Sequence, residues 1–248
     1  MQNKLFFIFI LILFSCKEKN KKLQKQFYDN GNLEYEFTII DDSLKHGIYK
    51  SYYKSGELKH IGNYVKGNVQ DSLIEFYKNG KIKGKGIIKN GYKFGWWLHY
   101  NQKGVLAGKS EFLLHESKFL KNQSIIYNNN GSINDSLSYY FKINIPDTIP
   151  LGKSLGKLEL YKSLIKSEKL YIWVIIDNEY KDNIIVKDSF SDGSLKPKFG
   201  IFSSKVGLKK VKGEVYEVAF TKEKDSMNEF MNIDKKFFEK IVYVKDTI

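Results

Sequence analysis

The side chains that most often carry chemistry are few in this chain, and they are not grouped as any familiar catalytic centre requires. The four histidines, His46, His60, His99 and His115, show neither H-x-H nor H-E-x-x-H spacing, so we expect no metal site. The sequence contains no G-x-x-x-x-G-K-[ST] phosphate loop. The letters G-x-S-x-G occur once, at Gly152 to Gly156, but a predicted strand follows them rather than the helix that a nucleophile elbow requires. Without a phosphate loop or a true elbow we expect no cofactor.

Acidic residues offer a second route to chemistry, because two carboxylates can act as a general acid and a general base. The candidate pairs are Asp41 with Asp42, Asp188 with Asp192, and Glu223 with Asp225. All lie in stretches rich in Asp, Ser and Gly, which favour turns for reasons unrelated to catalysis. We therefore expect a non-enzymatic protein.

The only cysteine, Cys16, lies where it can be modified rather than catalytic. Lys4 precedes an apolar segment, residues 5–14, that suits a secretory signal and is too short to span a bilayer. The sequence Leu13-Phe14-Ser15-Cys16 resembles a bacterial lipobox, which implies that Cys16 is lipidated and becomes the mature N-terminus. We predict a signal peptide at 1–15, a tether at 16–26, and a lipoprotein anchored to a membrane of the cell envelope, the outer membrane in a Gram-negative cell.

The charge is strongly positive, but its composition argues against nucleic acid as a partner. Basic residues number 41 against 28 acidic residues, giving a net charge of +13, and every basic residue is lysine. The bidentate guanidinium fork that reads guanine and phosphate is therefore absent. We interpret the lysines as a solvated surface with weak attraction to anionic lipid.

A short pattern occurs five times, with an aromatic residue four positions before a glycine and an aliphatic residue two positions after it. The glycines are 25, 24, 24 and 27 residues apart. Aromatic and branched residues followed by a polar turn with glycine are typical of β-hairpins. The pattern predicts an antiparallel meander with about two strands in each unit. The five copies are Phe27/Gly31/Leu33, Tyr52/Gly56/Leu58, Phe76/Gly80/Ile82, Tyr100/Gly104/Leu106 and Tyr127/Gly131/Ile133.

These units resemble the MORN repeat variant of bacterial proteins of the YwqK type, which reads approximately G-x-W-x-x-Y-x-x-x-G-x-x-x-x-x-G-x-Y-x-x-G. The closest matches are Gly47-Ile48-Tyr49 through Tyr64 and Gly67, and Gly95-Trp96-Trp97 through Tyr100 and Gly104. The resemblance covers about residues 24 to 135. It implies a non-catalytic scaffold or binding protein, and some such proteins are labelled antitoxin components.

Aromatic residues of the repeats are the candidate binding surface, because rings on neighbouring hairpins could contact a sugar or a peptide. An alternative interpretation, which we favour, is that the rings pack against each other and hold a single-layer sheet together. The residues concerned are Tyr49, Tyr52, Tyr53, Trp96, Trp97 and Tyr100.

The second half of the chain lacks the glycine repeat and contains short strand-like segments instead. Six short segments, many of them with alternating polarity, predict strands at 139–145, 157–161, 170–177, 184–187, 213–220 and 241–244. One short helix is predicted within 225–240, with Asp234 as its N-cap. We therefore expect a repeat domain at 27–133 and a small β-sandwich-like domain at 138–248, in an all-β protein.

The function predicted from the sequence is that of a lipid-anchored envelope protein that binds or scaffolds other molecules through its repeats. Its expected partners are the membrane, reached through the N-terminal lipid, and an envelope protein or glycan. Two alternatives stay open. One is an immunity or antitoxin component of a toxin pair, and the other is a glycan- or peptidoglycan-binding module.

Overall fold

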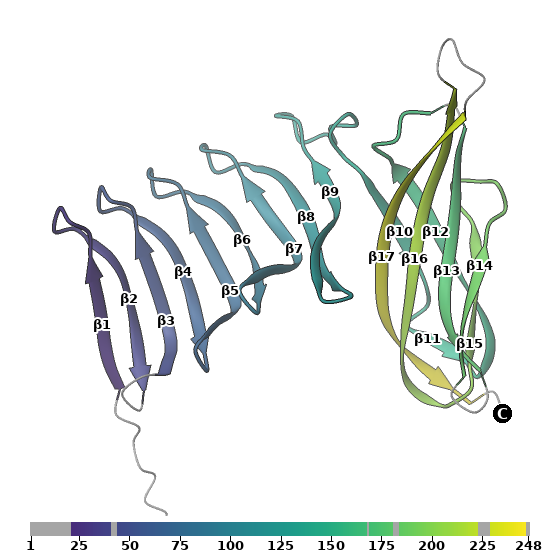
Figure 1. The fold of residues 1–248 in the computed structure, drawn as a ribbon, viewed down its shortest axis with the longest axis horizontal. Coiled ribbons are helices and arrows are strands. Elements are labelled where there is room, and N and C mark those ends of the chain that lie inside the picture. The colour runs from purple at the N-terminus through teal and green to yellow at the C-terminus, as the bar shows by residue number, and fades with distance from the viewer. Residues whose placement is uncertain (1–20, 41–43, 168, 181–183, 223–228, 247–248) are drawn as a thin grey trace, which may run out of the picture.

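The computed structural model describes residues 21–40, 44–167, 169–180, 184–222 and 229–246. Within these ranges the chain forms seventeen β-strands and no helix, and the strands make two separate sheets (Figure 1). The predicted all-β fold class is confirmed. Cys16, the signal segment, Asp41, Asp42, Glu223 and Asp225 lie outside the described residues.

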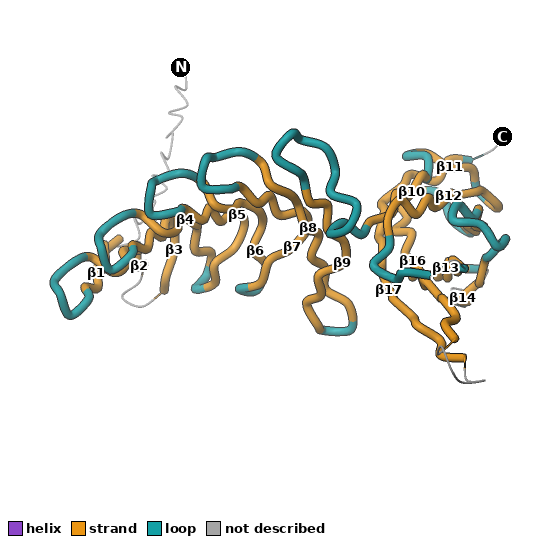
Figure 2. The backbone as a smooth tube through the Cα atoms, turned by 90° about the horizontal axis from the view of Figure 1, so that it is seen from above, coloured by secondary structure: helices purple, strands orange, loops and turns teal. Residues whose placement is uncertain are grey.

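The first sheet, here called the repeat sheet, is a meander in which each strand pairs antiparallel with the next one in sequence. Seen from above, its strands follow one another along the molecule like steps, and no second layer of described strands covers them (Figure 2). The strands are β1 Lys21–Phe27, β2 Leu33–Ile40, β3 Leu44–Tyr52, β4 Leu58–Val65, β5 Asn68–Phe76, β6 Ile82–Lys89, β7 Tyr92–Tyr100, β8 Leu106–His115 and β9 Lys118–Ile126.

The turns of the repeat sheet explain why glycine recurs in the sequence. Each of the five repeat glycines has a positive φ, between 77° and 103°, a conformation that costs glycine little. In the second turn, the Gly56 N–H donates to the Tyr53 carbonyl and the Tyr53 N–H donates to the Glu57 carbonyl, both at 2.8 Å. The turn between β8 and β9 adopts positive φ at Glu116 and Ser117. The hairpin therefore persists where the glycine pattern ends.

Tyrosine hydroxyl groups join the first four of these turns in a ladder of three hydrogen bonds. The hydroxyl of Tyr28 donates to the Tyr52 carbonyl at 2.9 Å, and that of Tyr53 donates to the Phe76 carbonyl at 2.8 Å. Tyr77 repeats the contact with the Tyr100 carbonyl at 2.7 Å. These bonds satisfy carbonyls at the strand ends and set the spacing between hairpins.

The second sheet, here called the C-terminal sheet, has mixed pairing in the order β10-β12-β15-β13-β16-β17-β11, with β14 paired to β13. β11 runs parallel to β17, and the single pair between β13 and β15 is also parallel. The strands are β10 Tyr140–Asn144, β11 Thr148–Pro150, β12 Gly152–Lys162, β13 Leu170–Glu179, β14 Ile185–Phe190, β15 Lys198–Ser203, β16 Gly207–Lys222 and β17 Glu229–Lys245.

The C-terminal sheet curls around one apolar core, so β12 and β15 face β13, β16 and β17 as in a small sandwich. Phe199 and Phe238 meet inside it, with ring centroids 5.8 Å apart. A Cβ atom at position 213 would lie 2.3 Å from the Phe238 ring. A side chain at this position would displace the Phe238 ring, so glycine lets the ring pack directly against β16.

The helix predicted within 225–240 is wrong, because residues 229–240 belong to strand β17. Lys236, Phe238, Val242 and Val244 are buried at every second or fourth position, which is the period of a strand. Asp234 is not an N-cap. It pairs with Lys236 instead, at 2.7 Å. The long antiparallel partner β16 overrides the local helical signal.

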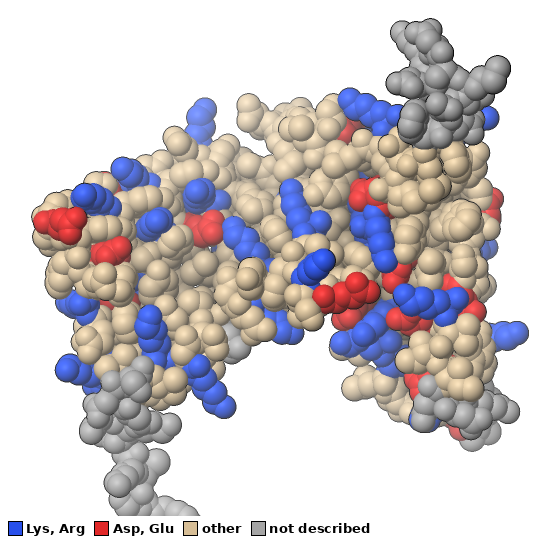
Figure 3. All heavy atoms as spheres, in the orientation of Figure 1, with Lys and Arg blue, Asp and Glu red and all other residues tan. Residues whose placement is uncertain are grey.

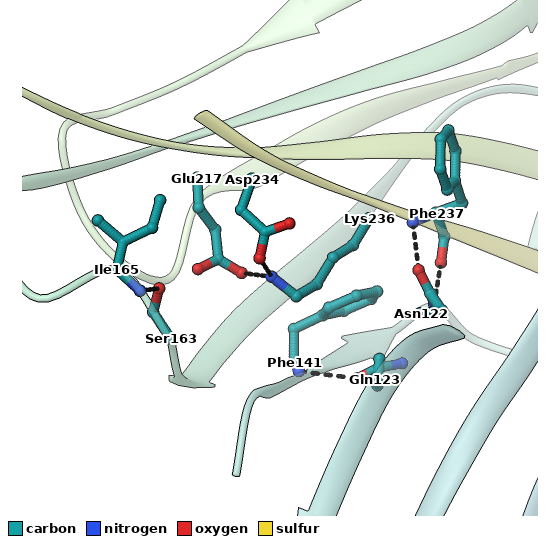
Figure 4. Close-up of polar contacts among 9 residues, drawn as sticks. All are labelled: Asn122, Gln123, Phe141, Ser163, Ile165, Glu217, Asp234, Lys236 and Phe237. Atoms are coloured by element: carbon teal, nitrogen blue, oxygen red, sulfur yellow. Dashed lines mark hydrogen bonds and ion pairs between the residues drawn. The ribbon is translucent and has the colours of Figure 1, made fainter. Parts of the chain in front are cut away.

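The two sheets meet at a specific polar junction. The Asn122 side chain of β9 accepts a hydrogen bond from the Phe237 N–H and donates one to the Phe237 carbonyl, both at 2.8 Å (Figure 4). The amide thereby replaces a neighbouring strand at the edge of β17. The Gln123 side chain accepts a bond from the Phe141 N–H at 2.9 Å, and the His115 ring stacks on Phe237 at 3.7 Å.

The ends of the repeat sheet differ from the sequence-based boundaries in two ways. β1 begins at Lys21, so residues 21–26, assigned above to the tether, form a strand that pairs with β2. The fifth unit keeps its glycine turn, but only the bridge between Tyr127 and Ile133 remains of its hairpin. Tyr139 then pairs with Ser124, so this unit connects the repeat sheet to the C-terminal sheet.

Candidate binding surface

The register of the repeat sheet assigns its side chains to two faces. Residues directly opposite each other on paired strands point to the same face, so a row can be followed from strand to strand. One unbroken row crosses all nine strands and contains four lysines, one glutamate and four aliphatic residues. It consists of Lys25, Glu36, Lys50, Ile61, Ile74, Lys85, Leu98, Lys109 and Ile125. We call this side of the sheet the lysine face.

The opposite side carries a row rich in glycine and polar residues, and we call it the glycine face. Its row consists of Gln26, Tyr35, Ser51, His60, Glu75, Gly84, His99, Gly108 and Ile126. Small residues here leave room for the large rings of the neighbouring row. A Cβ atom at Gly86 would lie 2.6 Å from the Trp97 ring.

The six aromatic residues predicted as one surface do not lie together. Tyr49 and Trp97 alternate with the lysine row and lie on the glycine face, whereas Tyr52, Trp96 and Tyr100 share the lysine face. Tyr53 belongs to the turn ladder described above.

The two adjacent tryptophans show how different the faces are. Trp97 is 0% exposed, and its indole N–H donates to the Ile87 carbonyl at 2.8 Å. Trp96 is 40% exposed. Trp97 is a packing residue, whereas Trp96 is available for contact.

The lysine face combines exposed apolar groups with cations. Ile48, Ile87 and Trp96 are exposed. The Lys109 ammonium lies 4.9 Å from the Trp96 ring centroid and the Lys85 ammonium 5.9 Å from that of Tyr100. Lysines also appear scattered over the visible surface of the repeat sheet (Figure 3). Such a surface suits an acidic or amphipathic partner.

Glu36 is the single acid of the lysine row and is already engaged. It accepts a hydrogen bond from the Tyr52 hydroxyl at 3.0 Å and pairs with Lys50 at 3.3 Å. Burial, followed by the hydrogen bond to Glu36, raises the pKa of Tyr52 above its ordinary value. The remaining lysines of the row therefore dominate its charge.

The glycine face holds a polar group that the sequence reasoning did not assemble. The Ser51 hydroxyl lies 2.8 Å from His60 Nδ1, and Glu75 pairs in register with His60. Glu75 is itself ion-paired with Lys93 at 3.1 Å. Burial lowers the pKa of both His60 and His99, so both rings are neutral at pH 7.

This polar group follows the repeat period, which is the signal that could have revealed it. Ser51, Glu75 and His99 are each 24 residues apart, and so are His60, Gly84 and Gly108. His46 and His115 lie elsewhere in the sheet. Ser51 is buried, so we interpret its contact with His60 as structural. Among the described residues, no group of three or more His, Cys, Asp or Glu is placed to hold a metal ion.

Comparison with known families agrees with the hairpin geometry. Residues 22–41, 45–66 and 73–90 match the family model of the MORN repeat variant. Three units of the chain are thus similar to the MORN repeat variant. The matched segments end at residue 90, but the next turn repeats the hydrogen bond of the second turn: the Gly104 N–H donates to the Asn101 carbonyl at 2.9 Å. No curated protein matches the chain.

The similarity to MORN repeats suggests that the repeat sheet is a module that binds proteins or membranes. The part of the chain that the structure describes has no helix long and apolar enough to cross a membrane.

A cleft of about 720 Å³ lies where the two sheets meet. Lysines and acids gather there (Figure 3). Its central acid is Glu214, which is buried and bonded to Lys187, Lys235 and Tyr216, each at 2.8 Å. Burial alone would raise the pKa of Glu214, but these three contacts outweigh it and lower the pKa from 4.5 to about 2.

The lowered pKa of Glu214 predicts a specific loss of stability in acid. A depressed carboxyl pKa stabilises the fold above the unfolded value of 4.5, and this contribution is lost as the pH falls through about 2. The shift corresponds to about 3 kcal/mol, which we reduce to about 1.5 kcal/mol because Lys187 is exposed and screened. Glu214→Gln should therefore lower the free energy of urea unfolding by about that amount at pH 7.

The same difference between wild type and Glu214→Gln should shrink toward zero near pH 2. Glu179→Gln is the matched control, because Glu179 contacts Lys205 at 3.9 Å on the surface. We expect this control to change the free energy of unfolding by less than about 0.5 kcal/mol. A pH-independent effect of Glu214→Gln would contradict the assigned role.

Proposed function

We propose that this protein is a non-enzymatic lipoprotein of the cell envelope that binds a partner protein through the lysine face of its MORN repeats. The observation that carries the proposal is the lysine row, which crosses nine strands without a covering layer of described strands. A surface repeated at a fixed spacing offers many weak contacts in parallel, and these add up when a partner spans several repeats. Lipidation at Cys16 would hold this surface close to a membrane.

The lysine face predicts where such a partner makes contact. A photo-crosslinking amino acid at Ile87, which is exposed on this face, should form a discrete adduct with one partner in intact cells. Lys85 is two residues from this position on β6, and Lys109 lies in the same row as Lys85, two strands away. The charge reversals Lys85→Glu and Lys109→Glu together should reduce the adduct by about tenfold, because like charges then face an acidic partner. The adducts are measured by immunoblotting and identified by mass spectrometry.

A probe at Leu208, which is exposed on the C-terminal sheet, is the matched control and should not give the same adduct. Equal adducts from Ile87 and Leu208, or adducts unchanged by the two reversals, would exclude the lysine face as the binding surface. A folded Trp96→Ala variant that loses affinity for purified peptidoglycan would favour the glycan alternative, because Trp96 is the exposed tryptophan of the repeats.

The immunity or antitoxin alternative makes its own prediction, which does not depend on the lysine face. A toxin encoded beside this gene should be neutralised by the wild-type protein. Absence of a neighbouring toxin gene would weaken that alternative.

The lipid anchor is tested separately, by metabolic labelling with palmitate and by intact mass. Wild-type protein from the membrane fraction should carry label and the added mass of acyl chains, whereas Cys16→Ala should carry neither and should leave the membrane fraction. Two or more acyl chains hold a protein stably on a bilayer, so release should be nearly complete. Unlabelled wild-type protein would refute the proposed anchor while leaving the binding surface untouched.

A further inference from the structure

The outer side of the C-terminal sheet carries a continuous block of apolar side chains, distinct from the lysine face. The block is formed by three adjacent strands, and in-register pairs such as Trp173 with Tyr216 and Phe220 with Met231 place its members side by side. It surrounds a hollow of about 600 Å³. We call it the apolar block, and it consists of Tyr171, Trp173, Ile175, Tyr216, Val218, Phe220, Met231 and Ile233.

These side chains do not belong to the core of the sheet. Ile172 and Val174, which alternate with Tyr171 and Trp173, are fully buried on the inner side. By contrast, Trp173 is 51% and Met231 58% exposed, and Phe220 and Ile233 are also exposed. No described segment covers the block, so its five exposed residues stay in contact with water.

The size of the block matches the centre of a protein interface. Five of its residues are exposed by roughly a third to a half or more, and large side chains of this kind have about 150–250 Å² of surface each. Together they leave roughly 500 Å² of apolar surface, which is near the upper end for a monomeric protein. A standard interface buries about 800 Å² on each partner, with an apolar centre and a polar rim.

The border of the block indicates which partner it fits. In a two-fold interface every residue near the axis meets its own copy, so an unbalanced charge would repel itself. The block contains no charged residue. Glu214, which pairs in register with Ile175 at the border of the block, is bonded to both Lys187 and Lys235. The large net charge of +13 is thus not concentrated on this surface.

We propose that a second copy of this chain covers the apolar block, with the outer sides of two C-terminal sheets packed face to face about a two-fold axis. Two sheets packed in this way interdigitate side chains over a layer about 10 Å thick, and the hollow receives apolar side chains of the other copy. The repeat sheets stay free, so each dimer presents two lysine faces.

The proposal is tested by cysteine crosslinking of the full-length protein in its own membranes. Three single variants, Trp173→Cys, Met231→Cys and Ile233→Cys, introduce a thiol at exposed positions of the block. Addition of a short bismaleimide should produce a species of twice the monomer mass with at least one of them. The parent chain, whose only cysteine is Cys16, and Ile48→Cys on the repeat sheet are the controls and should stay monomeric.

A second substitution separates a true interface from chance collision. Phe220→Lys is placed at an exposed position, so the fold should tolerate it. In the background of a cysteine variant that crosslinks, it should reduce the crosslinked dimer more than about tenfold, because each copy then places a charged lysine in the apolar interface. Ile48→Lys in the same background should have no effect.

Other outcomes would overturn the proposal. These are the absence of a dimer from all three cysteine variants, a dimer unaffected by Phe220→Lys, or a crosslinked species whose mass includes a different protein. If no cysteine variant gives a dimer and Phe220→Lys releases the protein from the membrane fraction, the block contacts a bilayer instead.

Discussion

Replacing Trp97 by alanine is expected to lower the free energy of unfolding by about 3–5 kcal/mol, the range observed when a large aromatic side chain is removed from a packed site. Trp97 is fully buried in the repeat sheet, donates a hydrogen bond to the Ile87 carbonyl, and lies under the Lys93 ammonium at 4.0 Å. All three interactions are lost together. Urea unfolding followed by circular dichroism measures the change.

Trp96→Ala is the matched control, since it removes the same side chain one residue earlier on the opposite face. Because Trp96 is exposed and contacts Lys109, we expect Trp96→Ala to lower the free energy of unfolding by only about 0.5–1 kcal/mol. Equal effects of the two substitutions would show that Trp97 is not a packing residue. If Trp97→Ala instead stays folded and loses its partner, the residue belongs to a binding site.

Gly86 provides a second check on the same contact. Gly86→Ala forces a Cβ atom against the Trp97 ring, and overpacking of this kind costs about 1–3 kcal/mol. In the Trp97→Ala background the added methyl group has space, so the penalty should vanish. A double-mutant cycle should therefore give a coupling energy of at least about 1 kcal/mol between the two positions.

The repeat sheet could be predicted from sequence because its signals are local and repeated. A turn with glycine needs only a few adjacent residues, and five copies at nearly equal spacing reinforce one another. The same period also contains the lysine row, because Lys50, Ile74 and Leu98 are 24 residues apart. The glycine pattern does not reveal the face to which each aromatic residue points. Trp96 and Trp97 lie on opposite faces because successive side chains of a strand alternate.

The C-terminal sheet was harder to predict because polar and apolar residues do not alternate along its central strand β13. The segment Leu170 to Ile176 reads as a continuous apolar run, since Tyr171 and Trp173 on the outer side are as apolar as Ile172 and Val174 inside. Periodicity then cannot identify the exposed face. The junction at Asn122 was also hidden, because its partner Phe237 is 115 residues away.

A buried ion pair in the C-terminal sheet gives the second large expected effect. Lys236 is 1% exposed and donates to Glu217, which is 0% exposed, and to Asp234 at 2.7 Å. Ser163 lies beside the Glu217 carboxylate (Figure 4). Removing one member of such a pair leaves an uncompensated charge in the core and costs about 3–5 kcal/mol. We expect this loss of free energy of unfolding for Lys236→Met at pH 7.

The pH dependence of Lys236→Met distinguishes a lost ion pair from a simple packing defect. Burial already raises the pKa of Glu217 above 4.5, and the attraction of Lys236 opposes that rise. Without Lys236 the pKa of Glu217 rises further. A raised carboxyl pKa means that stability is present at low pH and is lost as the pH rises through the folded-state value. The variant should therefore recover part of its stability, relative to wild type, between pH 7 and pH 4.5.

Two further variants isolate the pair from the methylene groups of the lysine. Adding Glu217→Leu to Lys236→Met removes the stranded carboxylate, so the double variant should regain most of the lost stability at pH 7, because apolar replacements of buried pairs are often neutral. Lys210→Met, which breaks an exposed pair with Glu239 at 3.4 Å, should cost less than about 1 kcal/mol. If the double variant is no more stable than Lys236→Met, the cost of that single substitution comes from lost packing and not from the uncompensated carboxylate.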